Sequence, residues 1–196
     1  KQAAFALCTK LSDAATAAGA VNTISIVDGG LHGHNTDGIG LVRDLTVNLR
    51  RSLAGKRIVV LGAGGAAGGV VGPLLNENPA ELVIANRTKD RAEEVAAKFA
   101  GVVARAFDEL AYLRPFDVVI NATSAGLKGE SPPFPPALVG PRSFCYDLVY
   151  GSTDTPFVVW AKTNGADRAV HGWGMLVEQA AESFAIWRGV RPDTKP

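Results

Sequence analysis

Apolar and polar positions follow two different periods along the chain. From residue 57 onward, short apolar runs alternate with stretches in which apolar residues recur at helical spacing. The runs are typical of buried strands, over 57–62, 81–86, 102–106, 116–123, 143–150 and 167–170. The helical stretches begin near residue 65 and extend over 89–99 and 154–164. Because strands that alternate with helices form right-handed βαβ units, we predict an α/β fold with a Rossmann-like, doubly wound, mostly parallel sheet and helices on both faces.

The residues before this region have a different pattern. Residues 1–19 favour two short helical pieces, and Ser12 is placed to cap the second. Alternating β-forming residues in 21–27 and 31–35 flank a glycine turn at 28–30 and predict a β-hairpin.

Longer helices are predicted on either side of the α/β region. Apolar residues recur at helical spacing from Asp37 to about Leu53, and such a helix is suited to connect two lobes. The Pro-rich segment 129–141 is expected to be a surface loop. A final helix is predicted over 173–188, with its apolar face formed by Met175, Leu176, Ala180, Phe184 and Trp187.

Composition narrows the class of protein. The chain has 196 residues, 47% of them hydrophobic, so a wholly disordered chain is excluded. Its 20 Lys and Arg residues nearly balance 19 Asp and Glu residues, so we expect no nucleic-acid partner. No apolar run reaches the roughly 20 residues that cross a bilayer, so we expect no membrane partner. Cys8 and Cys145 are far apart and lie among apolar neighbours, which predicts two buried thiols in a reducing cytoplasm.

A glycine-rich segment carries the first candidate chemistry. Residues 62–68, GAGGAAG, follow a predicted strand and open a predicted helix. Gly62 permits a tight turn, Gly64 lets the backbone approach a pyrophosphate, and the helix N-terminus supplies free N–H groups. The segment is the looser G-x-G-x-x-A form of the dinucleotide fingerprint. The alternative is a tight strand-to-helix turn without a ligand.

The end of the next strand favours NADP over NAD. NAD-binding folds usually place a carboxylate there to accept hydrogen bonds from the ribose hydroxyls, whereas this chain has Asn86, Arg87 and Thr88. The guanidinium groups of Arg87 and Arg91 can bind a 2′-phosphate, which a carboxylate would repel. The alternative makes Thr88 a helix N-cap and both arginines solvated charges.

Seven segments together resemble the shikimate dehydrogenase family. They occur in the family's order and cover the whole chain: AGAVNT (18–23), NTDG (35–38), GAGGAA (62–67), NRT (86–88), NATSAG (121–126), YDLVY (146–150) and GMLVEQA (174–180). The resemblance implies an NADP-dependent enzyme that interconverts shikimate and 3-dehydroshikimate, in the pathway to aromatic amino acids. It also implies a substrate lobe, a Rossmann-like lobe, and C-terminal helices that return to the first lobe.

The resemblance also implies a division of the chain. Residues 1–37 would be the remnant of the substrate-binding lobe, residues 38–171 the NADP-binding domain, and residues 172–196 the C-terminal helix region. Lys1 aligns with the family's catalytic lysine, so most of the substrate lobe would lie upstream. A chain limited to these residues is expected to bind NADP but to turn over shikimate poorly.

Residue roles follow from the same resemblance. Lys1 and Asp37 would form the proton-transfer pair, Asn22 and Gln179 would bind the substrate hydroxyls, and Tyr150 would lie near the substrate carboxylate. From the residues alone, Lys1 is an ordinary solvated lysine, Asp37 a helix N-cap, Asn22 a turn residue and Gln179 a polar residue on a helix face.

The resemblance places cofactor contacts along the chain. They are Asp13, Gly62, Ala63, Gly64, Gly65, Ala66, Asn86, Arg87, Thr88, Arg91, Thr123, Leu148 and Gly172. Two positions depart from the family's pattern, because Leu148 stands where many relatives have methionine and His171 where many have aspartate. No metal is expected, since His32 and His34 have no third ligand nearby in the sequence. Ser124 lacks the G-x-S-x-G context of a hydrolase nucleophile.

Three functions remain in competition. The leading one is NADP-dependent shikimate dehydrogenase. A quinate/shikimate dehydrogenase that uses NAD is disfavoured by the absence of an acidic residue at 86–88. A non-catalytic ligand-sensing module of the same fold is disfavoured by the presence of both Lys1 and Asp37. The sequence leaves the oligomeric state open, and a homodimer is among the assemblies that we consider.

Overall fold

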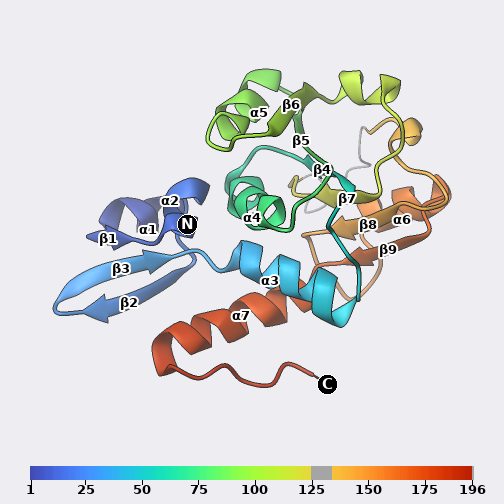
Figure 1. The fold of residues 1–196 in the computed structure, drawn as a ribbon. Coiled ribbons are helices and arrows are strands. Elements are labelled where there is room, and N and C mark those ends of the chain that lie inside the picture. Colours follow the sequence, from blue (N-terminus) through green and yellow to red (C-terminus); the bar gives the residue numbers. More distant parts are fainter. Residues whose placement is uncertain (125–133, 196) are drawn as a thin grey trace.

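A six-stranded parallel sheet forms the core of the larger part of the molecule, on the right in Figure 1. The computed structural model describes residues 1–124 and 134–195. The strand order is β6-β5-β4-β7-β8-β9, and each neighbouring pair is parallel. The strands are β4 (Arg57–Leu61), β5 (Glu81–Asn86), β6 (Val102–Ala106), β7 (Val118–Asn121), β8 (Phe144–Asp147) and β9 (Arg168–His171). This is the order of a doubly wound Rossmann sheet, so the predicted fold class is confirmed.

Helices cover both faces of this sheet because its strands are apolar on both sides. One core packs the sheet against α3 (Asp37–Arg43), α4 (Gly65–Asn76) and α5 (Lys89–Ala96). The other core packs it against α6 (Pro156–Thr163) and two 3-10 turns, Asp108–Tyr112 and Pro136–Leu138.

A smaller sheet lies at the other side of the molecule from α6 (Figure 1). Its strand order is β1-β3-β2, and the strands are β1 (Lys10–Leu11), β2 (Thr23–Val27) and β3 (Gly30–His34). Helix α1 (Gln2–Leu7) precedes β1, and helix α2 (Asp13–Ala18) lies between β1 and β2 in the sequence. The predicted hairpin and the Ser12 cap are confirmed, since Ser12 Oγ accepts a hydrogen bond from the Ala15 N–H at 3.2 Å. The turn is two residues long, Asp28 and Gly29, both with positive φ, and Gly30 already pairs with Val27.

The helix predicted from Asp37 to Leu53 is shorter than expected. After α3 the chain continues as a π-helical turn, Asp44–Asn48, and then leaves the helix at Arg50, whose φ is +53°. The N–H of Arg51 donates to the carbonyl of Leu45 at 2.8 Å and closes the turn. Leu53 is buried outside the helix, so its apolar character reflects the core and not helical periodicity.

Two further expectations are wrong in part. The Pro-rich segment is not wholly a surface loop, because Phe134, Leu138 and Val139 are buried, while 129–133 lie outside the described residues. Cys145 is buried as expected, but Cys8 is only half-buried. Both thiols are free.

Helix α7 (Trp173–Arg188) has the predicted length but not the predicted buried face. Its buried residues are Met175, Glu178, Ala181 and Ser183, whereas Ala180, Phe184 and Trp187 are exposed and Leu176 is half-buried. The helix instead packs closely on α3, where a Cβ at Gly40 would lie 2.7 Å from the Gln179 side chain. A close helix crossing through glycine turns polar residues of α7 inward.

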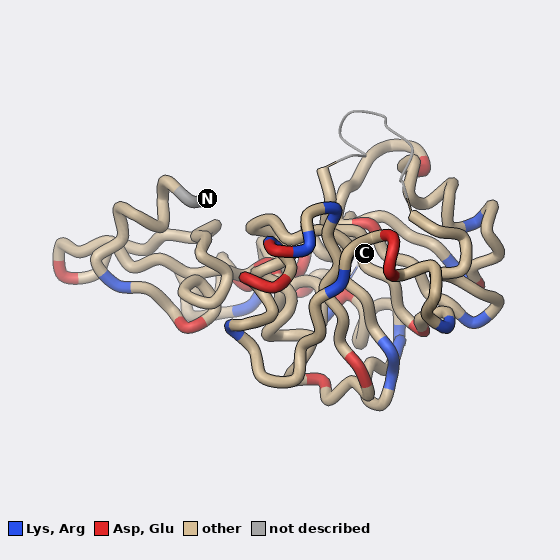
Figure 2. Tube along the Cα trace, turned by 90° about the horizontal axis from the view of Figure 1, so that it is seen from above, with Lys and Arg blue, Asp and Glu red and all other residues tan. Residues whose placement is uncertain are grey.

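Charged residues of both signs are spread along the whole described trace (Figure 2). No basic stripe gathers on one element of this trace, which agrees with the charge balance of the sequence. None of the described helices has the length and hydropathy needed to cross a membrane.

Candidate functional site

The glycine-rich turn joins β4 to α4 at the carboxyl edge of the sheet. Gly62 has a φ of +104°, and its N–H donates to the carbonyl of Ala85 at 2.7 Å. A Cβ at this position would lie 3.0 Å from the carbonyl oxygen of Ala122, so the turn requires glycine. Gly64 is exposed, and a Cβ there would meet nothing within 4 Å. The turn therefore packs against Ala122 at Gly62 but has open space at Gly64, where the N-terminus of α4 can receive an anion.

The loop after β7 forms the other side of this turn. Asn121 Oδ1 accepts hydrogen bonds from the N–H and the hydroxyl of Thr123, at 3.1 and 2.7 Å. The methyl group of Thr123 would lie 3.2 Å from a Cβ at Gly62. Strands β4 and β7 are neighbours at the point where the strand order reverses, which is where doubly wound sheets bind ligands.

The end of β5 presents positive charge. Asn86 Nδ2 donates to the carbonyl of Thr88 at 2.9 Å and shapes the turn into α5. Arg87 and Arg91 are exposed, and neither guanidinium has a hydrogen-bond or ion-pair partner among the described residues. Thr88 occupies the N-cap position of α5, but its side chain makes no capping hydrogen bond. The local capping explanation therefore accounts for the position of Thr88 and not for the two arginines.

A second cluster gathers residues from both ends of the chain. Lys1 Nζ donates to Asp37 Oδ2 at 2.5 Å, and Asn22 Nδ2 donates to Asp37 Oδ1 at 2.9 Å. The Asp37 side chain is 8% exposed, whereas the Lys1 side chain is 48% exposed. Asp37 is the first residue of α3, after Thr36 at the N-cap position, so the reading of Asp37 as an N-cap is wrong. Its carboxylate is committed to the cluster.

The backbone also holds Lys1 in place. Its carbonyl accepts hydrogen bonds from the N–H groups of Phe5, at 3.1 Å, and Val21, at 3.2 Å. The second of these bonds joins the first residue to the segment that carries Asn22.

Gln179 joins this cluster directly and is also linked to a chain of hydroxyl groups. Its Oε1 accepts hydrogen bonds from Asn22 Nδ2 at 3.4 Å and from Thr36 Oγ1 at 3.3 Å. Thr36 Oγ1 also lies 3.2 Å from Ser183 Oγ, which lies 2.6 Å from Thr23 Oγ1. Thr23 and Thr36 lie within the AGAVNT and NTDG segments, but neither they nor Ser183 had an expected role. The further signals for these hydroxyl groups were the position of Thr36 before Asp37 and the spacing of four residues between Gln179 and Ser183.

Three of the expected site residues meet where β8 ends and α7 begins. The N–H of Gly172 donates to the carbonyl of Val149 at 3.1 Å, and a Cβ at Gly172 would lie 2.7 Å from the carbonyl oxygen of Leu148. Tyr150, the next residue of this segment, is half-exposed. No hydrogen bond joins Tyr150 to the Lys1 cluster within the described part of the chain.

The buried carboxylate of Asp147 stabilises the segment that follows β8. Asp147 is fully buried and accepts hydrogen bonds from Thr155 Oγ1, Asn121 Nδ2 and the N–H of Val149. Burial raises the pKa of Asp147, although these hydrogen bonds oppose the effect. The three donors fix the loops after β7 and β8 relative to each other. His171 pairs with Asp147 in the strand register, and its Nδ1 is buried without a hydrogen-bond partner among the described residues.

Asp13 is the expected site residue that the structure joins to none of the others. It is exposed in the first turn of α2, and the described residues offer its carboxylate no ion pair. Helix α2 packs on α4, where a Cβ at Gly68 would lie 3.2 Å from the carbonyl of Ala18.

A group of hydrogen bonds and ion pairs around Glu178, here called the clamp, connects α7 to its neighbours. Glu178 is 1% exposed and accepts hydrogen bonds from Arg43 on α3, Asn48 on the π turn, and Arg191 and Thr194 in the C-terminal segment. Burial alone would raise the pKa of Glu178, but these four donors outweigh it and lower the pKa to about 2. Because Glu178 precedes Gln179, the clamp holds the helix that presents Gln179 to the cluster.

Known proteins resemble this chain over its whole length. The family model described as shikimate / quinate 5-dehydrogenase matches residues 44–128, and the model of the shikimate 5′-dehydrogenase C-terminal domain matches residues 172–196. A shikimate dehydrogenase (NADP(+)) of Alkalilimnicola ehrlichii is 56% identical, over 100% of this chain and 73% of its own length.

Solved structures agree with this similarity. The Ael1 enzyme from Pseudomonas putida superposes with a TM-score of 0.93 at 43% identity, over 99% of this chain and 72% of that one. A shikimate 5-dehydrogenase from Thermus thermophilus, solved in complex with NADP(H) and shikimate, superposes with a TM-score of 0.85 at 34% identity, over 98% of this chain and 71% of that one.

Proposed function

The chain belongs to the shikimate dehydrogenase family, and on that premise we propose how its residues interconvert shikimate and 3-dehydroshikimate with NADP(H). It is an oxidoreductase of the shikimate pathway. The observation that supports the proposed roles is the cluster in which Lys1, Asp37 and Asn22 meet Gln179. In it a lysine and a carboxylate suited to proton transfer lie beside amide groups that can bind hydroxyls.

The residues at the carboxyl edge of the sheet fit a dinucleotide. The open space in front of Gly64 and the start of α4 can receive the pyrophosphate, and Thr123 lines the same turn. The remaining positions of the turn that would contact the dinucleotide are Ala63, Gly65 and Ala66. Asp13 is proposed as a contact on the resemblance alone.

The charges at the end of β5 explain the choice of NADP. The guanidinium groups of Arg87 and Arg91 are exposed and can pair with a 2′-phosphate, and the hydrogen bond between Asn86 and Thr88 shapes the turn that carries Arg87. No carboxylate stands at residues 86–88, where one would repel that phosphate.

The protein's own groups bind the alcohol and move its proton. Asn22 and Gln179 bind the substrate hydroxyls, and Tyr150 binds near the carboxylate. In the oxidation direction, Lys1 Nζ accepts the hydroxyl proton, and Asp37 orients Nζ through the 2.5 Å contact and relays the proton onward. NADP+ supplies the hydride acceptor when it is bound, and Leu148 and Gly172 flank the position proposed for its nicotinamide.

We also propose the division of the chain into residues 1–37, 38–171 and 172–196. It is supported by the separate small sheet before α3 and by the packing of α7 on α3. A cytoplasmic location is proposed because Cys8 and Cys145 are free thiols. A homodimer is proposed as the assembly, to be measured by light scattering.

A steady-state assay tests the proposed roles. NADP+ or NAD+ reduction is followed by absorbance with shikimate or quinate, using the longest natural form of the protein. Asp37→Asn is expected to lower kcat by about 10²-fold or more. Asp28→Asn is the matched control, because Asp28 lies in the exposed hairpin turn and asparagine tolerates its positive φ.

Each alternative has its own outcome in this assay. Equal turnover of quinate with NAD+ would favour the quinate/shikimate dehydrogenase. NADP+ binding without turnover of either alcohol would favour the ligand-sensing module. Full activity of Asp37→Asn would refute the proton-transfer role.

A further inference from the structure

Two half-exposed aromatic rings lie against each other at the start of α7. Tyr150 and Trp173 have ring centroids 5.0 Å apart, with their planes tilted by 43°. Tyr150 is 48% exposed and Trp173 is 46% exposed, so both residues are in part accessible to a ligand. No motif in the sequence and no role carried over from the family includes Trp173.

The segment that carries Tyr150 is tied to α7 on both sides of that residue. Before it, the carbonyl of Val149 accepts the N–H of Gly172 at 3.1 Å. After it, the carbonyl of Gly151 accepts the indole N–H of Trp173 at 2.9 Å. Trp173 therefore holds the backbone after Tyr150 and contacts the Tyr150 ring with the same side chain. Without the indole, the ring would lose its neighbour and the segment would lose one of its two ties.

The position of the pair along α7 connects it to the polar cluster. Gln179 lies six positions after Trp173, which is about 9 Å along a helix axis. One six-membered ring with polar groups at opposite ends can bridge this distance together with its hydrogen bonds. Gln179 would hold one end of such a substrate and Tyr150 the other.

We propose that Trp173 is a positioning residue, which holds the Tyr150 ring at the carboxylate end of the substrate site. The proposal rests on the function proposed above, because it assigns Tyr150 to the substrate. Trp173 acts through Tyr150 and the Gly151 carbonyl, and it takes no part in proton or hydride transfer. Its loss should weaken substrate binding more than it slows the chemical step.

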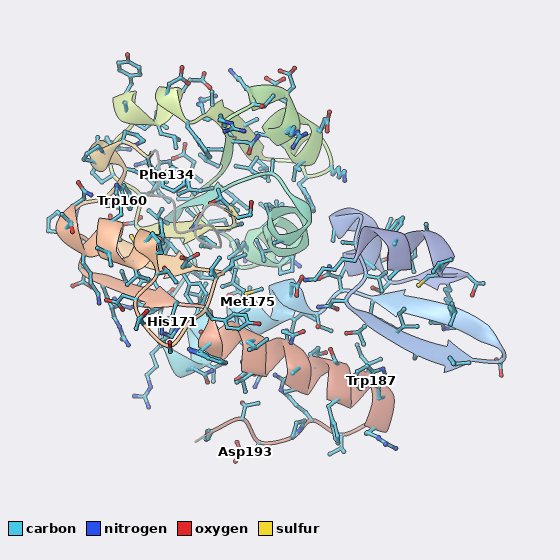
Figure 3. All side chains as sticks on the ribbon, turned by 180° about the vertical axis from the view of Figure 1, so that it is seen from behind. Phe134, Trp160, His171, Met175, Trp187 and Asp193 are labelled. Carbon is cyan, nitrogen blue, oxygen red and sulfur yellow. The ribbon has the colours of Figure 1, made fainter. Side chains whose placement is uncertain are left out.

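The chain contains a matched control on the same helix. Trp187 is also half-exposed and also donates its indole N–H to a backbone carbonyl, that of Ile24 at 2.8 Å. It lies at the opposite end of α7 from His171 and Met175, beside the hairpin (Figure 3). Replacing Trp187 thus removes a similar side chain with a similar hydrogen bond, far from Tyr150.

The first experiment compares KM and kcat in three variants of the full chain. Trp173→Ala should raise the KM for shikimate about fivefold, the effect of losing one aromatic pair, with kcat within about twofold of the parent and an unchanged Kd for NADP+. Trp173→Phe retains a ring against Tyr150 and should recover most of the loss. Trp187→Ala should leave the KM unchanged. A KM unchanged in Trp173→Ala, no recovery in Trp173→Phe, or an equal rise in Trp187→Ala would overturn the proposal.

The second experiment uses fluorescence and does not depend on turnover. The chain has three tryptophans, so Trp160→Phe and Trp187→Phe together leave Trp173 as the only indole. Adding shikimate to this variant should change its emission, and the change should be smaller when Tyr150 is replaced by alanine. Unchanged emission with an active enzyme overturns the role of Trp173 alone. A parent that oxidises neither alcohol and whose emission does not respond to shikimate overturns the proposed function as well.

Discussion

The buried carboxylate of Glu178 makes the stability of this fold depend on pH in a calculable way. The pKa of Glu178 is lowered from an ordinary value of 4.5 to about 2. A group whose pKa is lower in the folded state stabilises that state above its unfolded pKa, and the stabilisation is lost as the pH falls toward the folded pKa. The difference of about 2.5 units corresponds to about 3 kcal/mol, fully present at pH 7 and lost progressively between about pH 5 and pH 2.

The perturbation that isolates this contribution is Glu178→Gln. Glutamine has a similar shape but cannot titrate, and it leaves the guanidinium groups of Arg43 and Arg191 without a buried charge to pair with. We expect the variant to lose about 3 kcal/mol of unfolding free energy at pH 7. At pH 3.5, one unit below the ordinary pKa, the parent should have lost about 1.4 kcal/mol of the Glu178 contribution, and the variant none.

Urea unfolding followed by circular dichroism at several pH values measures this difference. All other carboxylates titrate in both proteins, so the gap between the two stability curves reports Glu178. Glu182→Gln is the control, because Glu182 lies one turn further along α7 and pairs with Arg191 alone while 27% exposed. It should cost no more than about 1 kcal/mol. Parallel stability curves for the parent and Glu178→Gln from pH 7 to pH 3.5 would refute the reasoning.

Three shorter predictions concern the cofactor site and the thiols. Gly64→Ala should raise the Kd for NADP+ about tenfold in calorimetry, because the added methyl occupies space proposed for the pyrophosphate. It should change the unfolding free energy by under about 0.5 kcal/mol, because the methyl meets only open space in the free protein. Arg87→Ala should weaken the binding of NADP+ by about tenfold or more and leave that of NAD+ nearly unchanged, whereas Lys98→Ala, in the exposed turn after α5, should affect neither; equal losses for both nucleotides would contradict the 2′-phosphate role. Burial raises the pKa of Cys145 to about 12, so a thiol reagent at pH 8 should label the half-buried Cys8 first, and Cys145 only on unfolding.

The sheet could be predicted from the sequence because its signal is local. Each buried parallel strand is a short apolar run, and the glycine turn after Leu61 is defined by residues that follow one another. The turn, Arg87 of NRT and Arg91 could be located for the same reason. The two-residue strand β1 was missed, because a bridge of two residues has no period.

The buried face of α7 could not be predicted, because it is set by a partner far away in the sequence. Periodicity favoured Phe184 and Trp187, which are large and apolar, yet both are exposed. Glu178 is buried because α3, the π turn and the C-terminal segment each bring it a donor. These donors are 135, 130 and 16 positions from Glu178 in the sequence, so a local pattern cannot predict the pairings.

The same long-range packing explains why the polar cluster can form at all. Lys1 and Asp37 are 36 positions apart, and Asn22 and Gln179 are 157 apart, so no local element brings these four side chains together. Gly40 allows α7 to approach α3 so closely that a Cβ at residue 40 would clash with Gln179. The ion pair between Arg43 and Glu178 stabilises this packing of the two helices. The hydrogen bond between Asn22 and Gln179 is 3.4 Å long, at the limit of such contacts, and a small shift of α7 would break it. The positions of the Asn22 and Gln179 amides, which we propose bind the substrate, therefore depend on the hydrogen bonds and ion pairs around Glu178. A loss of the Glu178 charge should disturb these amides through α7 before the sheet unfolds.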